Sequence, residues 1–251
     1  MQKKVTLISC CSLFCRSKNR LRTLSAILMM CLLTNQSLAI NGEALVNQKG
    51  CPECHDLRGP APSTIAGVLK RKAPDLFYAG SKFQERWLAN YLQKPIQLRP
   101  AGTVYLNFIK TNKKGEDEIT EVPGCESKLN PEEAASATQY LMTLKDNDMA
   151  TNVISEGKFS KARARKLFTK DEGCNGCHQV RLRGKQITGG VSCPDLFNAG
   201  DRLNPDWVFS FIQDPQHWDP KVWMPGRELD DAAIKLLTQY LMLQKGNREE
   251  P

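Results

Sequence analysis

The chain has 251 residues, which is enough for two small domains. Its composition, 41% hydrophobic and 25% charged, is typical of a soluble globular protein. The formal net charge of +8 falls to +2 without the first 39 residues, which carry six of the 35 basic residues and no acidic ones. A charge this small excludes nucleic acid as the expected partner.

The N-terminal segment has the order of an export signal. Basic residues precede an apolar stretch at 24–33, and Ser37-Leu38-Ala39 provides a small-x-small cleavage pattern. We therefore predict a signal peptide at 1–39, a mature chain that starts near Ile40, and a periplasmic location. The alternative is an uncleaved anchor, but about ten apolar residues fall short of the roughly 20 that span a bilayer, so we expect no transmembrane segment in the mature chain.

The rest of the chain contains an internal repeat. Residues 75–95 read DLFYAGSKFQERWLANYLQKP and residues 195–215 read DLFNAGDRLNPDWVFSFIQDP, at a constant offset of 120. The stretch TQYLM also recurs, at 138–142 and 238–242. The shared core and turn residues of 75–95 and 195–215 indicate two copies of one domain. We predict a first copy at 40–147 and a second copy at 148–251.

Each copy is predicted to be mostly helical. A first helix leads into a cysteine pair, at 42–48 and 159–168, and a second has apolar residues at helical spacing, at 84–93 and 205–213. Proline then ends the second helix in both copies. A third helix begins after Asn130, a favourable N-cap with proline and acidic residues behind it, and its counterpart begins near Asp230. The expected fold class is all-α, in two tandem helical domains.

Each copy carries the sequence Cys-x-x-Cys-His. The first motif is Cys51, Cys54 and His55, and the second is Cys174, Cys177 and His178. Two thiols at this spacing can form thioethers to one haem, and the adjacent histidine can coordinate the iron. A thioredoxin-like pair would need a βαβ context, a shared zinc site would need closer pairs, and disulfides would not explain the histidines.

This order of helix, Cys-x-x-Cys-His, helix, methionine loop and C-terminal helix resembles class I cytochromes c, twice over, from about residue 42 to 245. The resemblance implies two covalently bound haem c groups, with His55 and His178 as proximal iron ligands. It also implies that the carbonyl of Pro60, in the loop after the first motif, accepts the Nδ1–H of His55. The second copy has Gly184-Lys185 in that place and departs from the pattern.

The sixth iron ligand differs between the copies. Met224, followed by proline and glycine, matches the family's methionine loop and is predicted to ligate the second haem, with His217 as the competitor. The first copy has Val122 in that position, and valine cannot ligate iron. Its haem is therefore either five-coordinate, or ligated by Cys125, Lys110 or the N-terminal amine, or reached by Met142 or Met149.

The first copy also has an insertion between Pro95 and Pro123, where apolar and β-branched runs around a glycine-containing turn predict a short β-hairpin. We expect it to cover the haem edge or to form part of a partner interface. The two remaining cysteines, Cys125 and Cys193, have a disulfide as their simplest explanation.

The expected function is electron transfer between redox protein partners, as a carrier or as a subunit of a membrane-associated or periplasmic respiratory complex, with no catalytic residues assigned. The alternative is a dihaem oxidoreductase, similar to thiosulfate dehydrogenases or small dihaem peroxidases, with its chemistry at the haem of the first copy that lacks methionine.

Overall fold

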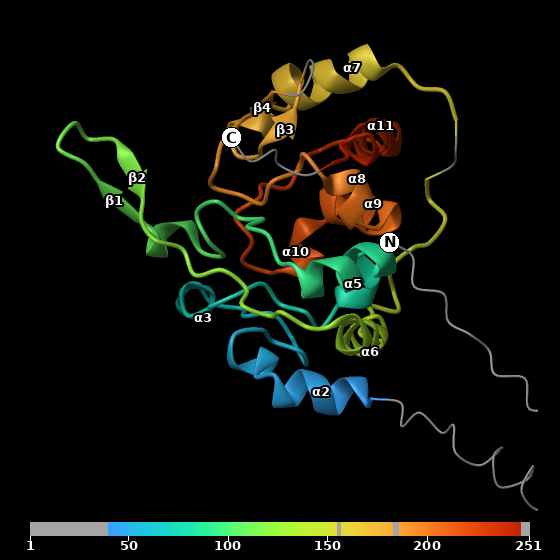
Figure 1. Ribbon diagram of the computed structural model, residues 1–251. Coiled ribbons are helices and arrows are strands. Elements are labelled where there is room, and N and C mark those ends of the chain that lie inside the picture. Colours follow the sequence, from blue (N-terminus) through green and yellow to red (C-terminus); the bar gives the residue numbers. More distant parts are fainter. Residues whose placement is uncertain (1–39, 155–156, 183–185, 247–251) are drawn as a thin grey trace, which may run out of the picture. The chain divides into compact units, whose positions relative to one another are not determined.

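The computed structural model describes residues 40–154, 157–182 and 186–246 (Figure 1). The predicted signal peptide lies outside these ranges. Within them, no helix is long and apolar enough to cross a membrane. The structure is mostly helical with two small antiparallel strand pairs, in agreement with the expected cytochrome-c-like fold.

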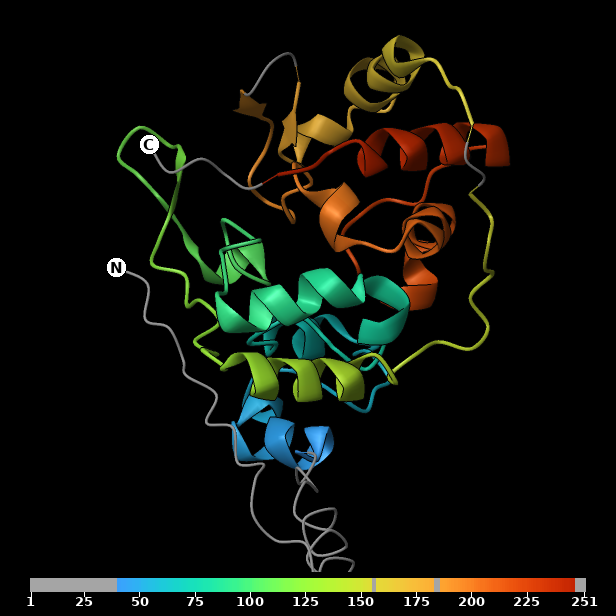
Figure 2. The same cartoon turned by 45° about the vertical axis from the view of Figure 1, so that its right-hand side comes forward.

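In the first copy, α2 (Gly42–Gln48) and α5 (Glu85–Gln93) pack on α6 (Pro131–Leu141), and α5 and α6 lie side by side in Figure 2. The predicted start of α6 is confirmed, because Asn130 and Glu133 form a complete capping box. The shorter elements are the 3-10 turn η1 (Cys51–Glu53), α3 (Ile65–Leu69), α4 (Ala79–Lys82) and the 3-10 turn η2 (Tyr105–Asn107).

The second copy repeats this arrangement. Here α7 (Lys161–Lys166) and α9 (Pro205–Gln213) pack on α11 (Asp231–Met242), which Asp230 caps as predicted. The first helix continues as a π-helical turn, η3 (Leu167–Asp171). The shorter elements are the 3-10 turn η4 (Cys174–Gly176), α8 (Ala199–Arg202), α10 (Pro215–Trp218), and the strands β3 (Val180–Arg181) and β4 (Ile187–Thr188).

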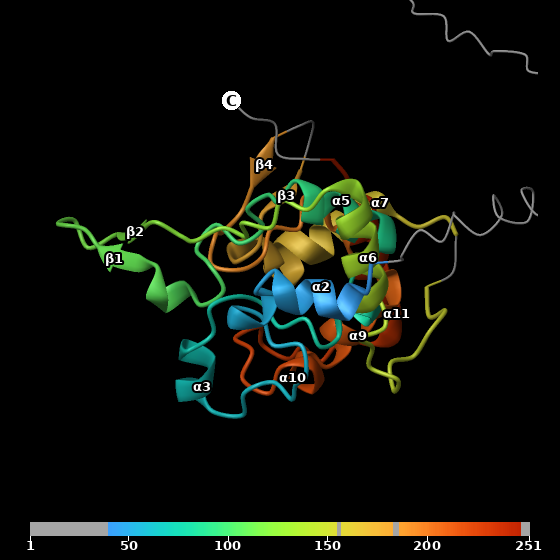
Figure 3. The same ribbon diagram turned by 60° about the horizontal axis from the view of Figure 1, so that its bottom comes forward.

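The predicted hairpin in the insertion is confirmed. Strands β1 (Ile109–Thr111) and β2 (Asp117–Ile119) are antiparallel, with Ile109 opposite Ile119. The hairpin stands away from the helices in both Figure 1 and Figure 3. The apolar run before it does not continue the strand, because η2 turns the chain at Tyr105–Asn107.

The two copies meet through equivalent residues. Phe83 forms an isolated antiparallel bridge with Leu203, its counterpart at the offset of 120. On either side, Gln84 N donates to Arg202 O at 2.9 Å and Asn204 N donates to Lys82 O at 2.8 Å. Each residue thus makes the contact that its counterpart makes in return, as in an isologous interface between identical subunits.

The described residues from Ile40 onward form one compact unit, and a single hydrophobic cluster includes buried side chains of both copies. Aromatic rings join the copies within it. The ring of Tyr78 stacks on that of Trp207, with centroids 6.4 Å apart, and meets that of Trp218 edge-on at 5.2 Å. The interface is therefore apolar and packed as well as hydrogen-bonded.

Candidate functional site

Both Cys-x-x-Cys-His motifs form the same 3-10 turn. Gly50 and Gly173 precede the turns with φ of +71° and +63°, values that favour glycine. His55 N then donates to Cys51 O at 3.0 Å, and the second motif makes the equivalent bond at 3.1 Å. The four motif cysteines are free thiols. The turn thus brings two thiols and an imidazole of each motif together on a few residues of backbone.

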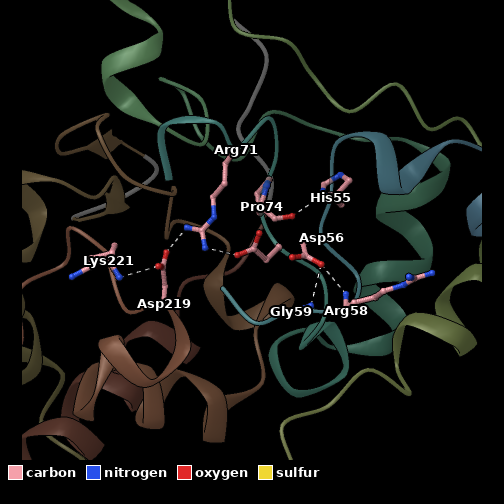
Figure 4. Close-up of polar contacts among 9 residues, drawn as sticks. His55, Asp56, Arg58, Gly59, Arg71, Pro74, Asp219 and Lys221 are labelled. Atoms are coloured by element: carbon pink, nitrogen blue, oxygen red, sulfur yellow. Dashed lines mark hydrogen bonds and ion pairs between the residues drawn. The ribbon is translucent and has the colours of Figure 1, made fainter. Parts of the chain in front are cut away.

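A proline carbonyl orients each histidine. His55 Nδ1 donates to Pro74 O at 2.6 Å, and His178 Nδ1 donates to Pro194 O at 2.8 Å (Figure 4 shows the first). Because a carbonyl can only accept, the proton lies on Nδ1, and Nε2 is left with a lone pair for a metal. Nothing else in the motif directs the ring, so this bond sets the direction in which each imidazole presents its ligand atom.

The prediction that Pro60 accepts from His55 is wrong. The Asp56 carboxylate accepts from Arg58 N at 2.8 Å and Gly59 N at 3.0 Å, which ties the Gly59-Pro60 loop into a turn of its own (Figure 4). The second copy lacks the expected loop, but His178 is still oriented there, because the Pro194 carbonyl accepts its hydrogen bond. Pro74 and Pro194 stand at the offset of 120, directly before the repeated DLF, so extending the repeat by one residue identifies both.

Sequence reasoning missed two buried cations. Lys82 and Arg202 are equivalent residues, 8% and 4% exposed. The Lys82 ammonium lies 4.9 Å from the ring centroid of Trp207 and makes no ion pair with the described residues. Burial, together with the nearby Arg99 and Arg202, lowers its pKa to about 7. Arg202 donates to Asn198 Oδ1 at 3.2 Å and to the carbonyl of Asp195.

Two buried donors near these cations also lack partners among the described residues, namely Trp207 Nε1 and Asn198 Nδ2. A buried N–H group without an acceptor is costly, and so is a buried cation without an anion. A haem carries two carboxylates, which are acceptors of the kind that such cations and donors require. The donor set as a whole, with free thiols, an oriented imidazole, buried cations and unpartnered donors, fits a covalently bound haem.

The predicted distal ligand of the second copy lies in the irregular segment between α10 and α11. Met224 is partly buried and packs against the hydrophobic core. The competitor is engaged elsewhere, because His217 Nε2 lies 2.7 Å from Asp146 Oδ2. This contact joins α10 to the segment after α6. Met224 therefore stays the predicted ligand of the second copy.

In the first copy, the structure separates the candidate ligands. Lys110 is exposed on β1 and lies 3.5 Å from Glu118, whereas Met142 and Met149 pack against the hydrophobic core. The pKa of the Cys125 thiol is lowered to about 7, chiefly by a hydrogen bond with the His55 imidazole and also by Ser127, against the opposing effect of burial. Of these side chains, Cys125 is the one for which an interaction with the proximal histidine is found.

The expected disulfide between Cys125 and Cys193 is not formed, since both are free thiols. Cys125 Sγ lies 3.2 Å from Ser127 Oγ, in the first copy. Cys193 N donates to Cys177 O at 3.3 Å, beside the second motif. Each cysteine thus belongs to the surroundings of a different motif.

Residues 161–245 match the family model described as Cytochrome c. This segment includes the second Cys-x-x-Cys-His motif and Met224, and it supports a c-type cytochrome, an electron-transfer protein with covalently bound haem c and redox partners. No curated protein and no solved structure matches the chain.

Proposed function

We propose that the protein is an exported, periplasmic cytochrome with two haem c groups, one for each copy, that passes electrons between redox partners. The observation that carries this proposal is the repeated site. Both copies place a Cys-x-x-Cys-His motif in the same turn and orient its histidine with an equivalent proline carbonyl, at 2.6 Å and 2.8 Å. The match to the cytochrome c family covers only the second copy, so the first rests on this equivalence.

When bound, haem supplies an iron that cycles between ferric and ferrous states. The residues of the chain hold and tune it. His55 and His178 would each bind the metal through Nε2, and the thiols of each motif would attach the ring. Buried cations favour the carboxylate form of the acidic groups beside them. Met224 would be the second protein ligand of the metal in the second copy, where a thioether would favour the ferrous state and raise the reduction potential.

The number of haems tests this proposal directly. We expect a pyridine haemochrome assay and intact mass measurement on the mature protein to give two haems per chain. Cys51→Ala with Cys54→Ala should leave one, and Cys174→Ala with Cys177→Ala should also leave one. Cys193→Ala is the matched control, since it removes a thiol beside the second motif and should leave two. A wild-type chain with a single haem would contradict the proposal.

A second candidate function is an oxidoreductase that works at the first haem. It is favoured by Val122, which stands where the second copy has Met224. An open iron would suit such an enzyme, but the Cys125 thiol interacts with the imidazole that would hold that iron. We propose that Cys125 fills the sixth position of the first site, which favours the electron-transfer function.

Carbon monoxide separates the two functions. Added to the reduced protein, it should leave the visible spectrum of the wild type unchanged, whereas Cys125→Ala should bind one equivalent per chain. Lys110→Ala should behave as the wild type does, because Lys110 is exposed on the hairpin. If the wild type itself binds one equivalent, the first site is open and the oxidoreductase becomes the better proposal.

The two sites differ in their proposed sixth ligands, and this difference suggests how electrons would pass between redox partners. Two sites with different axial ligands have unequal potentials, which gives electrons a preferred direction through the chain. The hairpin β1–β2 is an exposed addition to the first copy alone, and we propose that it contacts a dedicated redox partner in a periplasmic or membrane-associated complex. Co-purification of such a partner with the mature protein should be lost on deletion of residues 109–119, and co-purification that is equally efficient after the deletion would contradict this role.

A further inference from the structure

The segment after α5 belongs to the first copy, but it contacts the second. Asp195 N donates to Leu98 O at 2.9 Å. Asp195 follows Pro194, whose carbonyl accepts from His178 Nδ1 at 2.8 Å. The Pro194 carbonyl and the Asp195 N–H belong to the same peptide unit, so one peptide both orients the second histidine and bonds to the other copy. This bond holds the orienting proline in place from outside its own domain.

The first copy secures its equivalent loop in another way. Asp75, the counterpart of Asp195, is 7% exposed, and its carboxylate forms an ion pair with Arg71 at 2.5 Å. Arg71 also pairs with Asp219 of the second copy at 2.5 Å (Figure 4). Among the described residues, the backbone contact between Asp195 and Leu98 therefore has no equivalent at Asp75.

Arg99, the next residue, adds a positive charge at the same place. Burial lowers its pKa, but an arginine remains charged at neutral pH. The charges of Tyr78 and Cys193 are the largest effects that raise the pKa of Arg99 against burial. Cys193 N donates a hydrogen bond to Cys177 O of the second motif. Arg99 directly follows Leu98, whose carbonyl accepts from Asp195 N. Its positive charge therefore belongs to the segment that contacts the loop of the second motif.

We infer that Leu98 and Arg99 of the first copy complete the haem site of the second copy, where Leu98 O secures the loop that orients His178 and the Arg99 guanidinium raises the reduction potential. The inference rests on the proposed function and extends it, because it places part of the insertion in the site of the other domain. The physical reason is Coulombic. A nearby cation stabilises the reduced state, which carries one more electron, relative to the oxidised state.

Redox titration of the holoprotein, followed in the visible bands, tests the inference. Arg99→Gln should lower the equilibrium constant for reduction of the second site by roughly tenfold, or about 59 mV for a one-electron couple, and should change the first site by less. Arg99→Lys keeps the charge and should restore most of the shift. Lys110→Gln is the matched control, since it removes a cation from the same insertion at an exposed position, and should leave the second potential unchanged.

The second site is identified as the component that is lost in Cys174→Ala with Cys177→Ala. If that variant does not accumulate, Cys51→Ala with Cys54→Ala leaves the second site as the sole component. Equal shifts at both sites in Arg99→Gln, no shift at either, or equal losses in Arg99→Gln and Arg99→Lys would overturn the inference. A haem count below two in the wild type would instead overturn the proposed function, so the two failures are distinguishable.

Discussion

At the scale of single residues, two glycines show how closely the helices of each copy approach. Gly80 N donates to Leu144 O, and Gly200 N donates to Gln244 O, both at 2.8 Å. These bonds join the short helices α4 and α8 to the chain just beyond α6 and α11. A Cβ atom on Gly80 would lie 2.2 Å from Met142 O, and one on Gly200 would lie 2.1 Å from Met242 O. The repeated Ala-Gly thus marks a contact of backbone with backbone.

Gly80→Ala and Gly200→Ala are therefore expected to destabilise the protein, each by about 1–3 kcal/mol or more, because the obstructing atoms are backbone atoms that cannot rotate away. Thermal unfolding followed by circular dichroism measures the effect. Gly157→Ala is the control, since a Cβ there would meet nothing within 4 Å. Melting temperatures for Gly80→Ala and Gly200→Ala equal to that of Gly157→Ala would show that the close approach is absent in solution.

At the scale of elements, the helices that pack on one another were predictable from sequence and the short ones were not. The capping residues Asn130 and Asp230 gave the starts of α6 and α11, because a cap and a first turn are local features. By contrast, α3, α4 and α8 have only four or five residues, too few to show a helical period. The strands β3 and β4, of two residues each, gave no alternation at all.

The candidate site divides in the same way. The motif residues were predictable because the Cys-x-x-Cys-His spacing is itself what allows two thiols to attach one haem and the histidine to bind its iron. The role of Pro74 was not predicted, because the resemblance to class I cytochromes c assigned the accepting carbonyl to Pro60. The repeat alone would have identified it, since Pro74 and Pro194 stand at the offset of 120. Arg99 carries no signal in the sequence, since its role depends on which residues of the other copy it meets. Contacts between distant segments are set by packing, and one sequence alone does not reveal them.

At the scale of the whole molecule, an ionic group joins the two copies. Arg71 pairs with Asp75 in its own copy and with Asp219 in the other, with side chains 11%, 6% and 16% exposed. Burial raises the pKa of Asp75, and Arg71 opposes this effect. An arginine between two carboxylates in such surroundings cannot be removed without leaving negative charges largely out of water. The stability of the interface between the two copies is therefore expected to depend strongly on Arg71.

Arg71→Ala should accordingly destabilise the protein at neutral pH by about 3–5 kcal/mol, with a pH dependence of definite sign. Without Arg71, the folded-state pKa of Asp75 rises further above its value in the unfolded chain. A carboxyl group with a raised folded-state pKa contributes stability at low pH that is lost as the pH rises through that value. The loss relative to wild type should therefore be largest at neutral pH and should shrink on acidification towards the unfolded-state pKa of about 3.9.

Urea unfolding at a series of pH values measures this difference, with Arg86→Ala, an exposed cation on α5, as the control that should change little at any pH. Adding Asp219→Asn to Arg71→Ala should recover part of the loss at neutral pH, because it removes one of the two stranded charges. A loss in Arg71→Ala that is independent of pH would mean that the side chain acts through packing alone. Recovery at low pH would instead identify the ion pairs as the contact that holds the two copies in one unit.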